Sequence, residues 1–430
     1  MRARQPPKAL YSMHDESDRL SNLPAHVIDG ILSCLSIRDA VRTSILSNDW
    51  RYKWATLPHL VFDKDCSSTA SDEQVVDKRK IVNIIDHVFV LHFGSIHKFK
   101  LSHKDLIAVT DIDRWVLRVS RSSVEEFVLE IWKGQRYRMP SCLYFCKHLI
   151  HLELFNCVLN LPPAFKGFLN LKSLDLQHVT MTADAFENLI AWCPLLERLT
   201  LMNFDGFSNL KIHAPNLQFF DIGGEFEAVS FENTSLLSVV SIGLYVAAGA
   251  EFTGRLSGAC NMLKFFARLP CIQRLEVQSY FLQYLTLGNV PSRLPVPCLE
   301  LDYLSMRINY RDIKENKAAL CLFKSSPNLC ELEMLARPED DIPIAATGSS
   351  FWEEKIYVEG IFNQLRVVRV LDFFGKKSEL DFVKFLLANS PVLEKLTVKS
   401  ASSDGGLELL KELLRFRRAS VQAEVIYMDT

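Results

Sequence analysis

One group of residues in this 430-residue chain has the types and spacing of a metal site. It forms a C-x3-C-x-H-x2-H string, made of Cys142, Cys146, His148 and His151. Thiolate and imidazole groups are the usual ligands of zinc, and four of them could complete a tetrahedral site. The string runs directly into a strand pattern, in which both histidines take non-core positions and Cys146 suits a buried helix end. A structural role is therefore the competing interpretation.

Paired carboxylates, which can serve as general acid and base, occur at Asp340-Asp341 and Glu353-Glu354. Both pairs fall within 337–354, which contains two prolines and several small residues and predicts a long loop. The chain has no P-loop, no G-x-G-x-x-G, no H-E-x-x-H and no G-x-S-x-G sequence. We therefore expect a non-catalytic protein without a metal or cofactor.

The elements around these residues follow a repeat of the form L-x-x-L-x-L, and the copies start 20 to 36 residues apart. In each copy the last two apolar residues would point inward from a short strand, so stacked copies would form a parallel sheet over one core. Alternating leucines could also mark ordinary buried strands of an α/β sheet. The clear copies begin at Leu149, Leu171, Leu196, Leu217, Ile272, Leu301, Leu329, Leu365 and Leu393, and the weaker ones at Ile96, Val124 and Leu237.

Segments between the copies have helical periodicity. In TADAFENLIAWCP, Phe186, Leu189, Ile190 and Cys193 fall at i, i+3, i+4 and i+7, and Phe382 starts the same spacing in LDFVKFLLANSP. Turns such as CPLLERL and SPVLEKL use proline to leave the helix for extended structure. The predicted fold class is α/β: an irregular leucine-rich-repeat solenoid with a parallel sheet inside and helices outside.

In such a solenoid the non-leucine strand positions would face the concave side. They carry both charge signs and some aromatic residues, which suits a protein target better than a polyanion. A generic solvated sheet face is the alternative for any one of them. The substrate-binding candidates are His151, Glu153, Asp175, Arg198, Arg274, Tyr303 and Arg307, among a wider set of Lys98, Lys100, Glu126, Ser173, Thr200, Phe219, Asp221, Glu276, Glu331, Glu333, Arg369, Lys395 and Lys399.

Near the amino terminus, 18–62 holds three short helical patterns with more apolar residues than so small a unit can bury. The first stripe includes Leu23 and Ile28, with Ser21 or Asn22 available as cap and Pro24 in the first turn. Ser36 and Asp39 form a capping box before a second stripe. That stripe is Ile37, Ala40, Val41, Ile45 and Leu46, and Trp50, Trp54 and Leu57 form the third pattern before Pro58.

This segment resembles a plant F-box from Asp18 and Leu20 through Leu23-Pro24, Ala40 to Ser44 and Trp50-Arg51 to Phe62. The resemblance implies that the helices bind a Skp-type adaptor, which bridges to a cullin-RING module of a ubiquitin ligase. Ile37 stands where proline is common, and Asp49 where a basic residue usually precedes the tryptophan. A helical cap on the following domain is the alternative. The expected adaptor-binding residues are Leu23, Pro24, Ile28, Ile31, Leu32, Leu35, Val41, Leu46, Trp50 and Trp54.

The segment from Trp352 to Tyr427 resembles the FBD segment that ends many plant F-box leucine-rich-repeat proteins. We interpret it as terminal repeats plus a cap, made by a helix around Leu407 to Phe416 and the final VQAEVIY strand. The predicted division is a flexible leader (1–17), F-box (18–62), linker and first helix (63–95), solenoid (96–350) and FBD-like terminal part (351–430).

Composition is consistent with an intracellular binding protein. Lys and Arg number 49 against 51 Asp and Glu, which argues against a chain built to hold nucleic acid or an anionic membrane. The odd count of 11 cysteines suits a reducing compartment, and neither a signal peptide nor a membrane-spanning run is evident. The expected location is the nucleus, the cytoplasm or both. The expected function is substrate recognition in a Skp-cullin-F-box ligase; the alternative is an interaction scaffold outside any ligase.

Overall fold

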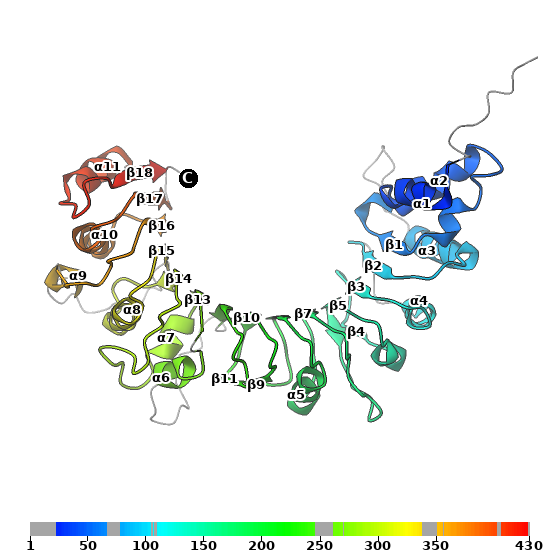
Figure 1. The fold of residues 1–430 in the computed structure, drawn as a ribbon, viewed down its shortest axis with the longest axis horizontal. Helices are drawn as coiled ribbons and strands as arrows, with labels where there is room; N and C mark the ends of the chain where they lie inside the picture. Colours follow the sequence, from blue (N-terminus) through cyan, green and yellow to red (C-terminus); the bar gives the residue numbers. More distant parts are fainter. Residues whose placement is uncertain are drawn as a thin grey trace, which may run out of the picture.

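The computed structural model describes residues 23–66, 78–104, 106, 110–245, 261–269, 271–337, 351–355, 357–401 and 406–428. They wind into an open arc with a parallel sheet on its inner side and helices on its outer side (Figure 1). The described part of the sheet has 14 strands. In spatial order they are β1 (His59–Phe62), β2 (Lys98–Ser102), β3 (Glu126–Glu130), β5 (His151–Phe155), β7 (Ser173–Gln177), β8 (Arg198–Met202), β10 (Phe219–Gly224), β12 (Val239–Leu244), β13 (Arg274–Ser279), β14 (Tyr303–Ile308), β15 (Glu331–Ala336), β16 (Val367–Phe373), β17 (Lys395–Ser400) and β18 (Glu424–Met428).

The outer side combines helices with two short parallel strand pairs, β4 (Tyr137–Arg138) with β6 (Cys157–Val158) and β9 (Asn209–His213) with β11 (Ala228–Glu232). The α-helices are α1 (Ala25–Ser33), α2 (Ile37–Arg42), α3 (Lys78–Leu91), α4 (Asp111–Ser120), α5 (Ala183–Ala191), α6 (Asn261–Phe266), α7 (Phe281–Leu285), α8 (Ile313–Ser325), α9 (Phe351–Glu354), α10 (Lys377–Asn389) and α11 (Gly406–Arg415). The 3-10 helices are η1 (Thr43–Ile45), η2 (Lys53–Thr56), η3 (Lys64–Cys66) and η4 (Ser141–Phe145).

The leucine repeat produces the sheet as predicted, which confirms the α/β solenoid. Each of the predicted copies begins two residues before a strand of the sheet. In the copy at Leu149, that residue, Leu152 and Leu154 are all buried, while the residues between them are not. Neighbouring strands pair in register, so Leu152 lies beside Leu174, and Leu174 beside Leu199. One continuous apolar core results.

The predicted outer helices are also present. Phe186, Leu189 and Ile190 of α5 face the core with at most 2% exposure, and Phe382 of α10 is fully buried. The chain leaves several strands through a residue with positive φ, such as Asn156 at 62°. Asparagine tolerates this left-handed conformation better than most residues, which allows the sharp turn toward the outer side.

At the amino-terminal end, Ser36 caps α2 by accepting a hydrogen bond from the Asp39 amide at 3.2 Å, as its spacing predicted. The expected start of the first helix needs a correction: Pro24 takes the N-cap position of α1, and its ring has no donor or acceptor that could cap the helix. The expected caps, Ser21 and Asn22, lie outside the described residues. β1 pairs with β2, so the sheet begins upstream of Ile96, where the first repeat was expected. Residues 1–22, including Asp18 and Leu20, lie outside the described part.

At the other end, α11 and β18 occupy the places expected of the final helix and strand, with β18 on the sheet edge beside β17. The loop predicted over 337–354 needs one correction. Glu353 and Glu354 belong to α9, which forms because Trp352 inserts completely into the core and packs on Phe382 and Phe385. Asp340-Asp341 lies outside the described residues.

Candidate protein-binding surfaces

The N-terminal helical unit buries only part of its apolar residues. Ile28, Leu32, Trp50 and Trp54 are at most 4% exposed and form the core of the unit. The Trp54 indole N–H donates a hydrogen bond to the Ser44 hydroxyl at 3.0 Å, which fixes the ring between helix and turn. α2 packs against β1 and η3, so the unit is joined to the first turn of the solenoid.

Other apolar side chains of the same unit remain on the surface. Ile31 and Leu35 are each 41% exposed, Leu46 is 64% exposed and Ile45 is 87% exposed. These residues come from the second half of α1, the turn after it, η1, and the residue that directly follows η1. Exposed isoleucine and leucine side chains in one small unit are typical of surfaces that bind another protein.

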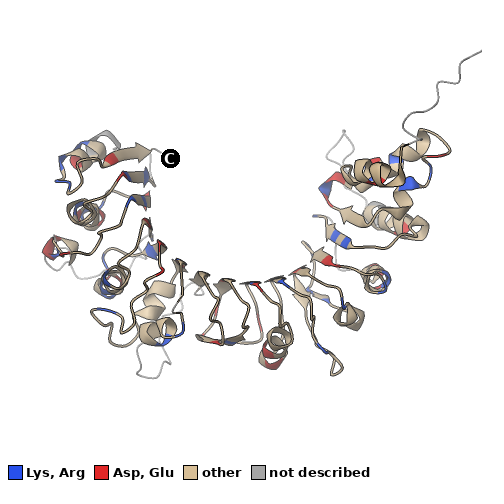
Figure 2. Ribbon diagram, viewed as in Figure 1, with Lys and Arg blue, Asp and Glu red and all other residues tan. Residues whose placement is uncertain are grey.

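The concave face is built from strand residues that alternate with the buried leucines. The strand register aligns these residues in ladders, one of which runs His151, Ser173, Arg198, Phe219 through adjacent strands. Figure 2 shows acidic and basic residues along the inner side of the arc. Arg198 lies over the Phe219 ring at 3.9 Å, and Arg274 and Tyr303 form the same pair at 3.8 Å. Each of these guanidinium groups is therefore held by a cation–π contact with a residue of the neighbouring strand.

Carboxylates fill a second ladder, formed by Glu153, Asp175, Asp221, Glu276 and Glu333 with hydroxyl residues between some of them. Burial raises the pKa of Asp175, and repulsion from Glu153 and Asp221 adds to this effect. Glu153 behaves differently, because a hydrogen bond from His151 lowers its pKa. Ion pairs such as Arg369–Glu331, at 3.1 Å, occur toward the C-terminal end of the face.

An aromatic row borders the concave face where β3, β5 and β7 end. The ring centroids of Trp132 and Phe155 are 4.6 Å apart, and those of Phe155 and His178 are 5.0 Å apart. Trp132 is 51% exposed. Rigid aromatic rings give large contact area at low entropic cost, so this row is well suited to anchor a bound chain.

Comparison with known proteins identifies the domains of this chain. Family models match in three places: an F-box domain over 20–61, the LRR repeats of an FBD-associated F-box protein (At5g56370) over 112–334, and an FBD over 358–398. The F-box/FBD/LRR-repeat protein At1g13570 of Arabidopsis thaliana is 39% identical over 420 residues, which cover 97% of this chain and all of that protein. The chain belongs to the F-box/FBD/LRR-repeat family. Two more relatives from Arabidopsis thaliana are each 27% identical to this chain. For FBD-associated F-box protein At1g66310 the match covers 96% of this chain and 97% of the relative. For F-box/FBD/LRR-repeat protein At5g53840 it covers 90% of this chain and 89% of the relative.

The ten predicted adaptor-binding residues all lie within the F-box, but they differ in burial. Within the F-box, Ile28, Leu32, Trp50 and Trp54 face inward, Leu23 and Val41 pack half-buried against them, and Pro24, Ile31, Leu35 and Leu46 face outward. Ile45 lies on the apolar stripe predicted for the second helix, and the spacing alone leaves open whether it is buried. It is exposed because α2 ends at Arg42 and the tighter η1 turn rotates Ile45 away from the core.

All seven substrate-face candidates of the repeat domain lie on the concave strands, but they differ in access. Arg198 and Arg274 are exposed, whereas Tyr303 is only 8% exposed beneath Arg274. His151, Glu153, Asp175 and Arg307 are half-buried. The sequence analysis did not include the aromatic row, because Trp132 and His178 follow the strands rather than belong to them. Aromatic residues directly after a leucine repeat were the available signal.

The C-x3-C-x-H-x2-H string runs from η4 into β5. Cys146 is buried directly after η4, and His151 joins the concave ladder in β5. Within the described ranges, no three His, Cys, Asp or Glu residues are placed to hold a metal ion. No helix in the part of the chain that the structure describes is long and apolar enough to cross a membrane.

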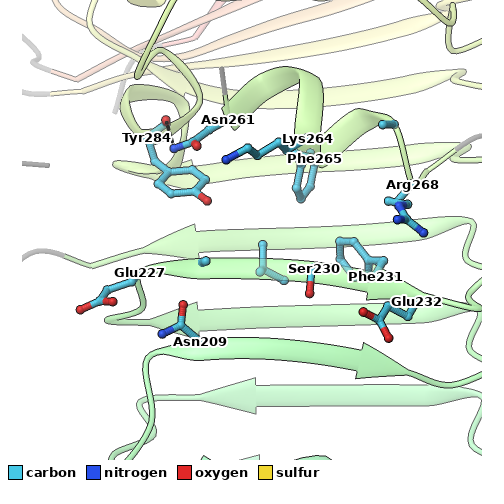
Figure 3. Close-up of a pocket in the computed structure, with 13 residues that line it drawn as sticks. Asn209, Glu227, Ser230, Phe231, Glu232, Asn261, Lys264, Phe265, Arg268 and Tyr284 are labelled. Atoms are coloured by element: carbon cyan, nitrogen blue, oxygen red, sulfur yellow. Dashed lines mark hydrogen bonds between the residues drawn. The ribbon is translucent and has the colours of Figure 1, made fainter. Parts of the chain in front are cut away.

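A hollow of about 630 Å³ lies on the outer side, between β11 and α6 (Figure 3). Glu227 and Glu232 line it from the β11 side, and Lys264 and Arg268 line it from α6 and its end. Acidic and basic walls thus face each other across this hollow.

Proposed function

We propose that this protein is the substrate-recognition subunit of a Skp-cullin-F-box ubiquitin ligase. The F-box would bind a Skp-type adaptor and, through it, a cullin-RING module, while the concave face of the repeats would bind a protein target. The protein would perform no chemistry itself. Holding the target near a charged conjugating enzyme raises the effective concentration of its lysines. This function implies an intracellular location, in the nucleus, the cytoplasm or both.

The exposed apolar residues of the F-box carry this proposal. The solenoid covers one side of the unit through α2, yet Ile31, Leu35, Ile45 and Leu46 remain uncovered. We assign adaptor contact to these residues and to Pro24. The buried members of the predicted set, Ile28, Leu32, Trp50 and Trp54, would position the contact surface without touching the adaptor.

A double substitution, Ile31→Asp with Leu35→Asp, tests the adaptor contact. Two charges on this surface are expected to reduce co-purification of a Skp-type adaptor at least tenfold, because each carboxylate would have to be desolvated in the complex. The solenoid should unfold at an unchanged temperature. Leu195→Asp is the matched control, since Leu195 is 42% exposed but lies in the repeats. Undiminished adaptor capture by the double variant would exclude this contact surface.

A scaffold outside any ligase is the second candidate, and exposed Asp49 beside buried Trp50 favours it by placing a negative charge on the F-box surface. Reconstitution separates the two functions. Recruitment of a cullin through the adaptor supports the ligase subunit, whereas adaptor binding without cullin supports the scaffold.

A further inference from the structure

The concave face contains a hollow of about 500 Å³ where β8, β10, β12, β13 and β14 lie side by side. Its lining includes Asp221 and Glu276 from the carboxylate ladder, two arginines, Arg307 and Arg337, and the ring of Tyr245. This hollow lies near the middle strands of the arc, where a bound target would contact the largest number of repeats (Figure 1).

Two glycines make room for this hollow. Gly223 and Gly243 are partners on neighbouring strands, at a ladder position where other strands carry side chains. A Cβ on Gly223 would lie 2.7 Å from the Tyr245 hydroxyl oxygen, and one on Gly243 would lie 3.7 Å from the Tyr245 ring. The missing side chain of Gly223 therefore lets the hydroxyl end of the Tyr245 ring lie close against the sheet, whereas a Cβ on Gly243 would make only ordinary contact with that ring. That residue is 41% exposed, so one part of the ring stays accessible from the concave side.

The arginines of the hollow are already neutralised by carboxylates of this chain. Arg337 forms a buried ion pair with Glu315 and also donates a hydrogen bond to the Ser279 carbonyl at 3.1 Å. Arg307 pairs with Asp372 at 3.2 Å. These two cations are therefore poor partners for an anionic ligand, which would have to compete with an existing carboxylate.

The acids of the hollow are in the opposite situation. Among the ion pairs of the described residues, none includes Asp221 or Glu276; their hydrogen-bond partners are the neutral side chains of Ser241 and Gln278. Arg274 is near Glu276 but lies stacked on Tyr303. Burial raises the pKa of both carboxyl groups, and the charge of Asp221 raises that of Glu276 further. A cation entering the hollow would relieve this repulsion.

We propose that the hollow between β8 and β14 binds the cationic head of a lysine or arginine side chain of the target protein. Asp221 and Glu276 supply the countercharge, and the accessible Tyr245 ring supplies a cation–π surface. The inference rests on the proposed function in one respect, that the concave face binds the target. Beyond the proposed function, it specifies the kind of target, which is a protein that inserts a basic side chain near the centre of the arc.

A peptide-display selection tests the proposal with the full-length protein. The probe is a random twelve-residue library, selected separately on the wild type and on Asp221→Asn with Glu276→Gln. We expect Lys or Arg enrichment on the wild type only, and at least tenfold weaker binding of a selected peptide to the double variant. Glu126→Gln with Glu331→Gln is the control, because it removes two concave-face charges that already pair with Lys98 and Arg369. Its effect should stay below twofold.

Three results would overturn the proposal: selected peptides without basic enrichment, no selected peptide at all, or equal loss of binding in the control variant. The last result would mean that general acidity, rather than the hollow, attracts the peptide. Adaptor capture is measured on the same samples. Loss of adaptor and cullin binding with intact basic-peptide binding would count against the ligase function alone, so the two hypotheses fail separately.

Discussion

The F-box and the repeat domain place their apolar residues in opposite ways. In the F-box, Ile45 and Leu46 are 87% and 64% exposed although the unit has a core of its own. Along the concave face of the repeats, leucines such as Leu174 and Leu199 are buried, and the surface between them is polar or charged. One surface is suited to bury apolar area, and the other to read charge and shape.

Two surfaces of such different composition would bind their partners in different ways. An apolar patch gives affinity with little discrimination, which suits a partner shared among many proteins. A polar face discriminates better, because a mismatched partner leaves buried charges unpaired. In the proposed function, the F-box supplies affinity for a common adaptor and the repeats supply selectivity for one target.

The largest effect on stability should come from substituting a buried residue of the F-box, and an exposed residue of the same unit provides the comparison. Trp54→Ala removes a ring that is 1% exposed and should destabilise the F-box end by about 3–5 kcal/mol. Leu46→Ala should cost less than about 0.5 kcal/mol, as surface substitutions do, yet weaken adaptor binding. Chemical denaturation and adaptor titration of both variants provide the check. Equal destabilisation by the two substitutions would contradict the assignment of Leu46 to a contact role.

The sequence predicts the elements of the repeat domain better than it predicts burial in the F-box. The L-x-x-L-x-L spacing predicts all strands from β2 to β17 of the sheet, because inward alternation on a repeated strand is a local property. Helical spacing likewise finds α5 and α10. In the F-box, however, helical spacing assigns both Ile45, on the second stripe, and Trp54, in the third pattern, to apolar positions. Trp54 is covered because η2 packs against α1 and α2, whereas the η1 turn leaves Ile45 exposed.

The concave hollow was less accessible to prediction. Asp221 and Glu276 follow from strand alternation, but Tyr245 and Arg337 lie just beyond strand ends. Their place depends on turns and on long-range partners such as Glu315, which is 22 residues from Arg337 in the chain. The repeat pattern cannot predict such long-range contacts, because it locates each strand only from the leucines of that strand.

A smaller effect concerns stability and pH on the concave face. Folding raises the pKa of Asp221 and Glu276, so the folded protein binds more protons than the unfolded chain between the ordinary and the raised pKa. The free energy of unfolding should therefore fall as pH rises through that window. Asp221→Asn with Glu276→Gln should flatten this dependence and raise stability at neutral pH, measured by urea denaturation from pH 4 to pH 8.

The ion-paired control, Glu126→Gln with Glu331→Gln, should not gain stability at neutral pH, because it removes attraction to Lys98 and Arg369 rather than repulsion. A gain of stability in this control equal to that of the Asp221/Glu276 variant would mean that overall net charge controls stability. The comparison of the two variants therefore tests whether the unpaired acids of the concave face lower the free energy of unfolding of the repeats.

The smallest expected effect is that of Asp49, which is exposed beside buried Trp50 in the F-box. Asp49→Lys restores the charge that F-box sequences resembling this one usually carry. A single exposed charge contributes about 0.2–1 kcal/mol to binding and acts mainly on the association rate. We therefore expect a two- to fivefold change in adaptor association rate, reduced at high salt. Surface plasmon resonance with Arg51→Gln as the neighbouring control measures it. A change above tenfold in the dissociation rate would instead place Asp49 inside the contact surface, and the F-box would then read charge as the repeats do.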